Sequence, residues 1–206
     1  MAGSVRQIIE VPCTVEALER SEALSQLAPE ALTALGAESI DGDALGVEAA
    51  ARVDAAIEAC LAAYDPRGVY KLFNPAICTL PPEYSEPAIM LVGTMMMFHG
   101  QSVYERLRRA AHCALMAVTI GPDNPAALPD ACARALVESA ADHVNAAIVA
   151  AAMEEGLYTD DRLSPGMGDF PLDTRSQFVF YTQSEKRLGL KLGKDGVFEP
   201  RYSTVG

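Results

Sequence analysis

The sequence contains no tryptophan and only three histidines, and its basic residues are outnumbered by its acidic ones. Sixteen Lys and Arg residues face 28 Asp and Glu residues, so the formal net charge of the 206-residue chain is −12. An acidic protein repels the phosphates of nucleic acids and the headgroups of anionic lipids. We therefore expect neither a nucleic acid nor a membrane as a partner.

Cysteine is scarce, and its spacing does not suggest a metal site. The five cysteines are odd in number and widely separated, with no C-x-x-C pair and no Cys/His cluster. This pattern disfavours a structural zinc or iron–sulfur site and predicts reduced thiols. Because no secretory signal is recognisable, we expect a cytoplasmic protein. A nucleophilic pairing of Cys113 with a histidine stays open, although a buried inert thiol is the favoured interpretation.

Long apolar runs and familiar catalytic motifs are also missing. The most apolar stretch, residues 88–98, is much shorter than the roughly 20 residues of a membrane-spanning helix. No Walker loop, G-x-G-x-x-G, G-x-S-x-G or H-E-x-x-H motif occurs in the sequence. Half of the residues are nevertheless hydrophobic, which is enough for a sizeable core in a chain of this length.

Helical periodicity alternates with β-branched runs, which predicts an α+β or mixed α/β protein. The acidic segment 38–43 divides an N-terminal strand and helix portion, residues 1–45, from a main body, residues 46–206. The portion 1–45 is a candidate for a small subdomain. We expect strands at 5–11, 69–73, 88–98 and 115–120, helices at 14–27, 30–35, 47–64, 102–111, 131–155 and 173–187, and a hairpin turn at 194–196.

Two local signals refine the predicted helix boundaries. Ser102 and Glu105 have the spacing of a capping box, in which each side chain bonds the other residue's main-chain N–H. Asp130 is the expected N-cap of the longest helix. On one face of that helix, Glu138, Asp142 and Asn145 follow each other at spacings of four and three residues.

Segment 162–171, R-L-S-P-G-M-G-D-F-P, has the composition of a rigid binding loop. Pro165 and Pro171 restrict the backbone, whereas Gly166 and Gly168 permit positive φ and close approach. Arg162 offers a planar set of donors that suits a carboxylate. Such a loop can hold an amino-acid-like ligand through main-chain hydrogen bonds. Composition alone favours the alternative, an ordinary connector with a surface arginine.

Four segments in order resemble the reactivation domain family of cobalamin-dependent methionine synthase. Arg162-x-x-Pro165-Gly166 is similar to the family's R-x-x-P-G-Y signature, and residues 117–122 (A-V-T-I-G-P) are similar to its A-T-I-G-P strand end. Glu138 matches the glutamate of a long helix that faces the ligand. Residues 189–203 resemble the family's closing stretch. The resemblance covers about residues 85–206 and makes 46–206 a reactivation-domain-like body.

The resemblance implies a C-shaped α+β fold with a central, mainly antiparallel sheet flanked by helices. It also implies S-adenosylmethionine as the ligand, with Arg162 on its carboxylate and the main chain around Ser164 and Gly166 on its other parts. Glu138 would face the positive amino or sulfonium group, unless it forms an intrahelical pair with Arg134. The implied binding residues, with no catalytic residue among them, are Arg162, Ser164, Pro165, Gly166, Met167 (a Tyr in the family) and Glu138.

The same resemblance implies an accessory role in the reductive reactivation of cobalamin. The chain lacks a D-x-H-x-x-G motif, so the corrinoid would sit on a partner, either a corrinoid-binding protein or a methyltransferase subunit, with a flavodoxin-like electron donor. Two alternatives stay open. One is a docking module for such a partner that has lost its ligand. The other is an enzyme that uses the Arg162 loop for a different small carboxylate.

Overall fold

The computed structural model describes residues 7–37, 40–41, 45–78, 87–121 and 126–206. Its strands are β1 (Ile8–Pro12), β2 (Arg67–Phe73), β3 (Pro75–Cys78), β4 (Ala88–Leu91), β5 (Met97–His99), β6 (Cys113–Gly121), β7 (Lys191–Leu192), β8 (Phe198–Glu199) and β9 (Tyr202–Val205). Its helices are α1 (Arg20–Ser25), α2 (Pro29–Ala34), α3 (Val47–Ala63), α4 (Gln101–Leu107), α5 (Ala127–Glu154), α6 (Arg175–Thr182) and α7 (Ser184–Leu188), with a 3₁₀ turn at Leu172–Thr174.

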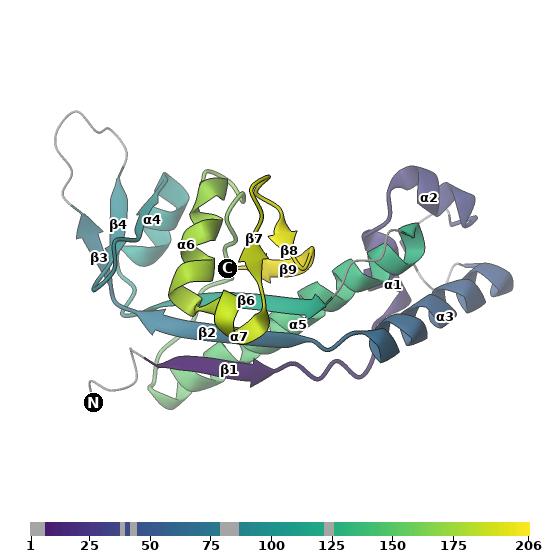
Figure 1. The fold of residues 1–206 in the computed structure, drawn as a ribbon, viewed down its shortest axis with the longest axis horizontal. Helices are drawn as coiled ribbons and strands as arrows, with labels where there is room; N and C mark the ends of the chain where they lie inside the picture. Colours follow the sequence, from purple (N-terminus) through teal and green to yellow (C-terminus); the bar gives the residue numbers. More distant parts are fainter. Residues whose placement is uncertain (1–6, 38–39, 42–44, 79–86, 122–125) are drawn as a thin grey trace.

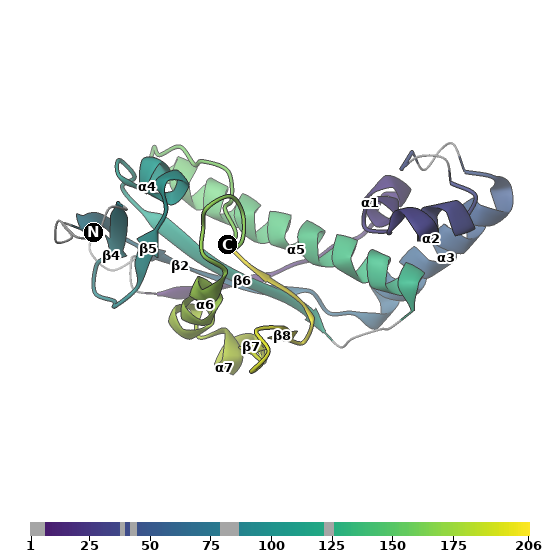
Figure 2. The same ribbon diagram turned by 90° about the horizontal axis from the view of Figure 1, so that it is seen from above.

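A four-stranded antiparallel sheet in the order β1-β2-β6-β9 forms the centre of an elongated body (Figure 1). Helix α5 runs along one face of this sheet, and α6 and α7 cover the other (Figure 2). Helices α1 to α3 gather at one end, whereas α4 and the small sheet β3-β4-β5 lie at the opposite end. The predicted α+β class with a mainly antiparallel sheet flanked by helices is confirmed.

Strand β6 divides the hydrophobic core into two clusters. Met116 and Val118 belong to the cluster beneath α5, α1 and α3, whereas Leu115 and Ala117 belong to the cluster beneath α6 and β5. Alternate residues of a strand point to opposite faces of a sheet, so one apolar run serves both clusters. A strand covered on both faces is apolar throughout rather than alternating, which explains why residues 115–120 could be recognised as a buried strand.

The N-terminal portion packs against the rest of the chain. Strand β1 pairs with β2 over its whole length, and Leu24 of α1 is fully buried in the cluster that contains Leu136 of α5. Arg20 makes two hydrogen bonds to Asp54 of α3, at 2.7 and 2.8 Å, and this guanidinium lowers the pKa of the Asp54 carboxyl. The division of the chain near residue 45 stays a prediction, and most of the acidic segment 38–43 lies outside the described residues.

The expected strand at 88–98 is wrong, because the chain folds there into the hairpin β4–β5. Gly93 has φ +82°, a conformation that side chains other than glycine rarely adopt. Thr94 closes the turn: its hydroxyl donates to the Leu91 carbonyl at 2.7 Å and accepts from the Met96 N–H at 2.9 Å. The uniformly apolar composition of this segment hides the turn from a periodicity argument.

Three predicted helices are shorter than expected, among them α4, which ends at Leu107 instead of residue 111. Helix α1 begins at Arg20 instead of residue 14, because Glu19 and Glu22 form a capping box there. The helix expected at 173–187 is split at Gln183, whose φ is +54°. The buried hydroxyls on either side of this break, those of Thr182 and Ser184, bond back to main-chain carbonyls of α6. These bonds tie the residues on both sides of the break to the last turn of α6.

The longest helix, α5, begins at Ala127, so Asp130 lies within its first turn and is not its N-cap. Asp130 is buried and accepts a hydrogen bond from the Tyr202 hydroxyl at 2.9 Å, and it pairs with Arg134 at 2.5 Å. It therefore links α5 to β9. None of the helices in the described part of the chain combines the length and the apolar character that crossing a bilayer requires.

Gly68 lets α5 approach the sheet closely, and we expect Gly68→Ala to lower the free energy of unfolding by about 1–3 kcal/mol. A Cβ at this position of β2 would overlap Cγ2 of Val144 on α5 and lie 3.3 Å from Cγ2 of Val118. A β-branched side chain in a helix has one strongly preferred rotamer, so Val144 yields little. Urea denaturation of the variant measures the effect.

A double-mutant cycle distinguishes the steric overlap with Val144 from the low intrinsic preference of alanine for a β-strand. Val144→Ala removes the methyl groups that a Cβ at position 68 would meet, so the Gly68→Ala penalty should shrink in its presence. Strictly additive penalties would show that the contact between β2 and α5 does not limit residue 68.

Candidate functional site

A cleft of about 620 Å³ lies in the described part of the chain, and its size is typical of small-molecule sites. We call it the α5 cleft. Its apolar floor comes from β2, β6, the end of α5 and three phenylalanines, and its polar groups come mainly from α4 and segment 157–163. The side chains that line it include Leu72, Phe98, Arg106, His112, Cys113, Leu115, Met116, Asn145, Ile148, Thr159, Asp160, Arg162, Phe170 and Phe178.

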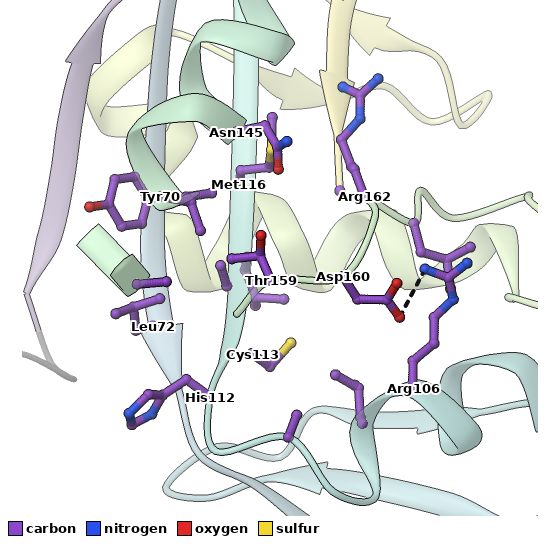
Figure 3. A pocket seen from close by; sticks show the side chains of 18 of the residues that line it. Tyr70, Leu72, Arg106, His112, Cys113, Met116, Asn145, Thr159, Asp160 and Arg162 are labelled. Atoms are coloured by element: carbon purple, nitrogen blue, oxygen red, sulfur yellow. Dashed lines mark ion pairs between the residues drawn. The ribbon is translucent and has the colours of Figure 1, made fainter. Parts of the chain in front are cut away.

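Figure 3 shows how the polar groups are arranged around this cleft. Arg162 lies along one side, across from Asn145 and Met116, and His112 lies at the far end. Arg106 of α4 pairs with Asp160 at 3.3 Å and donates to the Asp161 carbonyl at 3.0 Å. These two contacts hold segment 157–163 against α4, and this segment carries Arg162.

The side chain of Arg162 is four-fifths buried and is held in place along its length. Its stem packs on Gly206, where a Cβ would lie 2.9 Å from Cγ of Arg162. Its Nη2 forms an ion pair with Oε2 of Glu138 on α5. Its Nη1 is buried and has no hydrogen-bond partner among the described residues. The guanidinium is therefore fixed in position with one donor nitrogen unused.

Glu138 is half-exposed and lies beside the guanidinium of Arg162. The alternative of an intrahelical pair with Arg134 is wrong, because Arg134 pairs with Asp130 one turn earlier. Of the predicted binding residues, the structure brings Arg162 and Glu138 into direct contact although they are 24 residues apart.

The loop that follows Arg162 is closed by its own hydrogen bonds. The N–H of Gly166 donates to the Phe170 carbonyl at 2.8 Å, and that of Met167 donates to the Ser164 carbonyl at 3.0 Å. The N–H of Ser164 points at the Met167 sulfur at 3.4 Å. Gly166 has φ +98°, as its expected role in the turn requires. A ligand that uses these main-chain donors has to replace bonds that already exist.

The remaining predicted residues do not line the α5 cleft. Ser164 and Pro165 line a second hollow of about 390 Å³, which we call the Arg175 hollow and describe below. Gly166 and Met167 are exposed at the tip of the loop, and 51% of the Met167 side chain is accessible. The structure thus gathers Arg162 and Glu138 at one place and distributes the other four around the loop, and their ligand-binding roles stay predictions.

Asp169 fastens the loop to α4 and replaces the expected capping box. Its carboxylate accepts hydrogen bonds from the N–H groups of Gln101, at 2.6 Å, and Ser102, at 3.3 Å, and from the Ser102 hydroxyl. The Ser102 hydroxyl, followed by these N–H groups, lowers the pKa of the Asp169 carboxyl. The capping box is wrong because Glu105 instead bonds Arg108 and Gln101.

We expect Asp169→Ala to destabilise α4 at neutral pH and to speed hydrogen exchange of the α4 amides several-fold. A carboxyl whose pKa is lower in the folded state stabilises that state above its pKa, and it loses this effect when it is protonated. The difference in thermal midpoint between wild type and variant should therefore be largest at pH 7 and should vanish as the pH falls below about 4. A difference that persists at pH 2 would contradict this explanation.

Burial of the cysteine in the α5 cleft favours its protonated thiol. Burial raises the pKa of the Cys113 thiol to about 12, and the reactive species is the thiolate. The neighbouring His112 bonds Asn74 through Nδ1 at 3.0 Å, and its Nε2 lies 4.0 Å from Glu155. Within the described part of the chain, no group of three or more His, Cys, Asp or Glu side chains is placed to hold a metal ion.

Most residues of the cleft could not be predicted from a sequence motif. Asn145 is an exception, because its spacing places it on the same helical face as Glu138. Thr159, Asp160 and Arg106 had none: a loop and a separate helix meet only in the tertiary structure.

Comparison with known proteins gives a match at the level of the fold. No protein-family model matches the sequence, and neither does any curated protein. Among solved structures, the crystal structure of the MetH reactivation domain bound to AdoHcy matches 97% of this chain and 77% of its own, with a TM-score of 0.65. The chain has the MetH reactivation domain fold.

This match confirms the predicted resemblance at the level of the fold. It extends well beyond residues 85–206, where the motifs lie, and it takes in most of the N-terminal portion. The two chains share 18% sequence identity. A shared fold does not fix the chemistry of a site, so the function of the MetH-type fold in this chain has to be argued from its own residues.

Proposed function

We propose that this protein binds S-adenosylmethionine and assists the reductive reactivation of a corrinoid cofactor that a partner protein holds. The observation that carries this proposal is the unused Nη1 of Arg162 beside the α5 cleft. A buried donor without a partner destabilises a protein by about 1–3 kcal/mol, so such groups often mark a ligand site. A carboxylate satisfies this donor with a charge-assisted hydrogen bond.

The residues around Arg162 fit an amino acid that carries a sulfonium group. Nη1 is available to a ligand carboxylate while Nη2 stays with Glu138. Glu138 supplies a negative charge close to the guanidinium, which favours the positive amino or sulfonium group of the same ligand. The apolar floor of the cleft suits the adenosyl part, and a MetH-type fold bound to AdoHcy supports a ligand of this class.

S-adenosylmethionine supplies a methyl group on an activated sulfur, and the corrinoid supplies the metal that accepts it. The residues of this chain bind and orient the donor, and the cleft floor excludes water from it. No residue of the chain needs to act as nucleophile or base, in keeping with the protonated thiol of Cys113. The corrinoid would reside on a methyltransferase subunit or corrinoid-binding protein, with a flavodoxin-like electron donor.

Isothermal titration of the purified protein with S-adenosylmethionine tests the proposal. We expect saturable binding and a higher thermal midpoint with the ligand. S-adenosylhomocysteine lacks the positive charge on sulfur and should bind more weakly in the wild type, whereas Glu138→Gln should reduce that difference. No heat and no thermal shift at about 1 mM ligand, which corresponds to roughly −4 kcal/mol, would contradict ligand binding.

A docking module that has lost the ligand is the second candidate. The closed loop favours it, because the N–H groups of Ser164, Gly166 and Met167 are used within the loop. Co-purification with a corrinoid protein, combined with no binding of S-adenosylmethionine, would establish this alternative.

A further inference from the structure

The Arg175 hollow has no lining residue in common with the α5 cleft. It is formed by residues 164–165 of the loop, the first residue of α6, the turn between β7 and β8, and strand β9. Two guanidinium groups, from Arg175 and Arg201, line it together with the hydroxyl residues Ser164, Ser203 and Thr204. Asp195 is its one acidic lining residue. A hollow with an excess of positive charge stands out in a chain whose net charge is −12.

Arg175 is held in one orientation while the end of its guanidinium stays available. Its Nε donates to the Leu172 carbonyl at 3.2 Å, and its guanidinium lies over the ring of Phe198 at 5.3 Å from the centroid. Neither Nη atom bonds any residue in the described part of the chain. Gly196 of the turn lies beside Nη2, since a Cβ at this position would be 3.7 Å from that nitrogen, at van der Waals distance.

Arg201 provides the second cationic group. Its side chain is 52% exposed, and its Nη2 pairs with Oδ1 of Asp130 at 3.6 Å. Asp130 is already bonded by Arg134 and the Tyr202 hydroxyl, so its charge is shared among several donors. The carboxylate of Asp195 accepts the Val197 N–H at 3.1 Å. The charges that line the hollow therefore sum to about one positive unit.

We propose that the Arg175 hollow binds the phosphate group of a small organic molecule. The planar guanidinium fork matches the oxygens of a tetrahedral oxyanion, and neighbouring hydroxyls add donors. Charge of one sign in a concave surface raises the local concentration of the opposite ion. The volume of about 390 Å³ lies in the range of small-molecule sites, and the apolar side chains of Val197 and Phe198 offer a surface for the organic part.

Titration with inorganic phosphate and with phenyl phosphate, in a phosphate-free buffer, tests this inference. We expect both to bind, and phenyl phosphate to bind more tightly because it also contacts the apolar side chains. Arg175→Gln and Arg201→Gln should each weaken phosphate binding by about tenfold or more, as the loss of a hydrogen bond to a charged group implies. Arg201→Gln is the safer variant for folding, because that side chain is exposed.

Two further variants distinguish a site from a general charge effect. Lys194→Gln also removes one positive charge, from the turn between β7 and β8 that borders the hollow, but it changes no lining residue, so phosphate affinity should stay near the wild-type value. Asp195→Asn removes the acidic lining residue and should tighten binding by about threefold or more. A purely structural role for Arg175 and Arg201 would not produce that gain.

Three results would each overturn the inference. The first is that neither probe binds at 10 mM, which corresponds to about −3 kcal/mol. The second is an equal loss of phosphate affinity in Arg175→Gln and Lys194→Gln, and the third is that phenyl phosphate binds no more tightly than inorganic phosphate. Arg162→Ala should leave phosphate affinity unchanged. The outcome therefore does not depend on whether the α5 cleft binds S-adenosylmethionine.

Discussion

Replacing Phe178 by alanine is expected to lower the free energy of unfolding by about 3–5 kcal/mol. The Phe178 side chain is 1% exposed and contacts two other rings, Phe98 on β5 and Phe170 in the loop, each at 6.1 Å between centroids. Phe98 and Phe170 also meet edge to face at 5.3 Å. Truncation leaves a cavity and breaks a cluster that holds α6, β5 and the loop together. Urea denaturation measures the loss.

Phe180 provides the matched control, because it lies two residues further along the same helix. Its side chain is 71% exposed, so Phe180→Ala should change the free energy of unfolding by less than about 0.5 kcal/mol. Similar losses in both variants would mean that the effect reflects α6 itself and not the ring cluster.

Removing the guanidinium of Arg162 is expected to weaken S-adenosylmethionine binding by roughly 10- to 150-fold in Arg162→Ala. A hydrogen bond to a charged group contributes about 1.5–3 kcal/mol, and each 1.4 kcal/mol is a factor of ten in affinity. Arg162→Lys keeps the charge but loses the planar fork of donors. Its affinity for S-adenosylmethionine should therefore lie between those of the wild type and Arg162→Ala. Glu138 loses its partner in Arg162→Ala but is half-exposed, so we expect little loss of stability.

Calorimetric titration of the three proteins under identical conditions checks this result. Arg67→Ala is a suitable control, because Arg67 is half-exposed, pairs with Asp65 at 3.4 Å and does not line the α5 cleft. Unchanged affinity in Arg162→Ala would remove Arg162 from the ligand site. Binding would then have to be sought elsewhere on the MetH-type fold.

Local sequence patterns predicted much of the fold. The helix expected at 47–64 is α3, and its predicted face, with Ala50, Val53 and Ile57, is buried. The apolar run at 115–120 is the centre of β6. The turn at 194–196 joins the pair β7 and β8. These predictions hold because the burial of a regular element depends on the spacing of its own side chains, which can be read along the chain.

The predictions that failed concern specific hydrogen bonds, some between distant segments and some within a turn. The cap of α4 comes from Asp169, which lies more than 60 residues later, and Ser102 is drawn to it and away from Glu105. The β4–β5 turn is closed by Thr94 within a run of apolar residues. In both places, a specific hydrogen bond outweighs a local propensity that differs little between alternatives.

For the candidate site, the sequence by itself determined the kinds of group available: an arginine before a Pro- and Gly-rich loop, and a glutamate on a long helix. Only the tertiary structure decided that Arg162 and Glu138 meet, that Nη1 is left buried without a partner in the described chain, and that Ser164 faces a different hollow. Residue type fixes which hydrogen bonds and charges are possible. Which of them form depends on the packing of α5, the loop and β9 against one another, and that packing is a property of the whole fold.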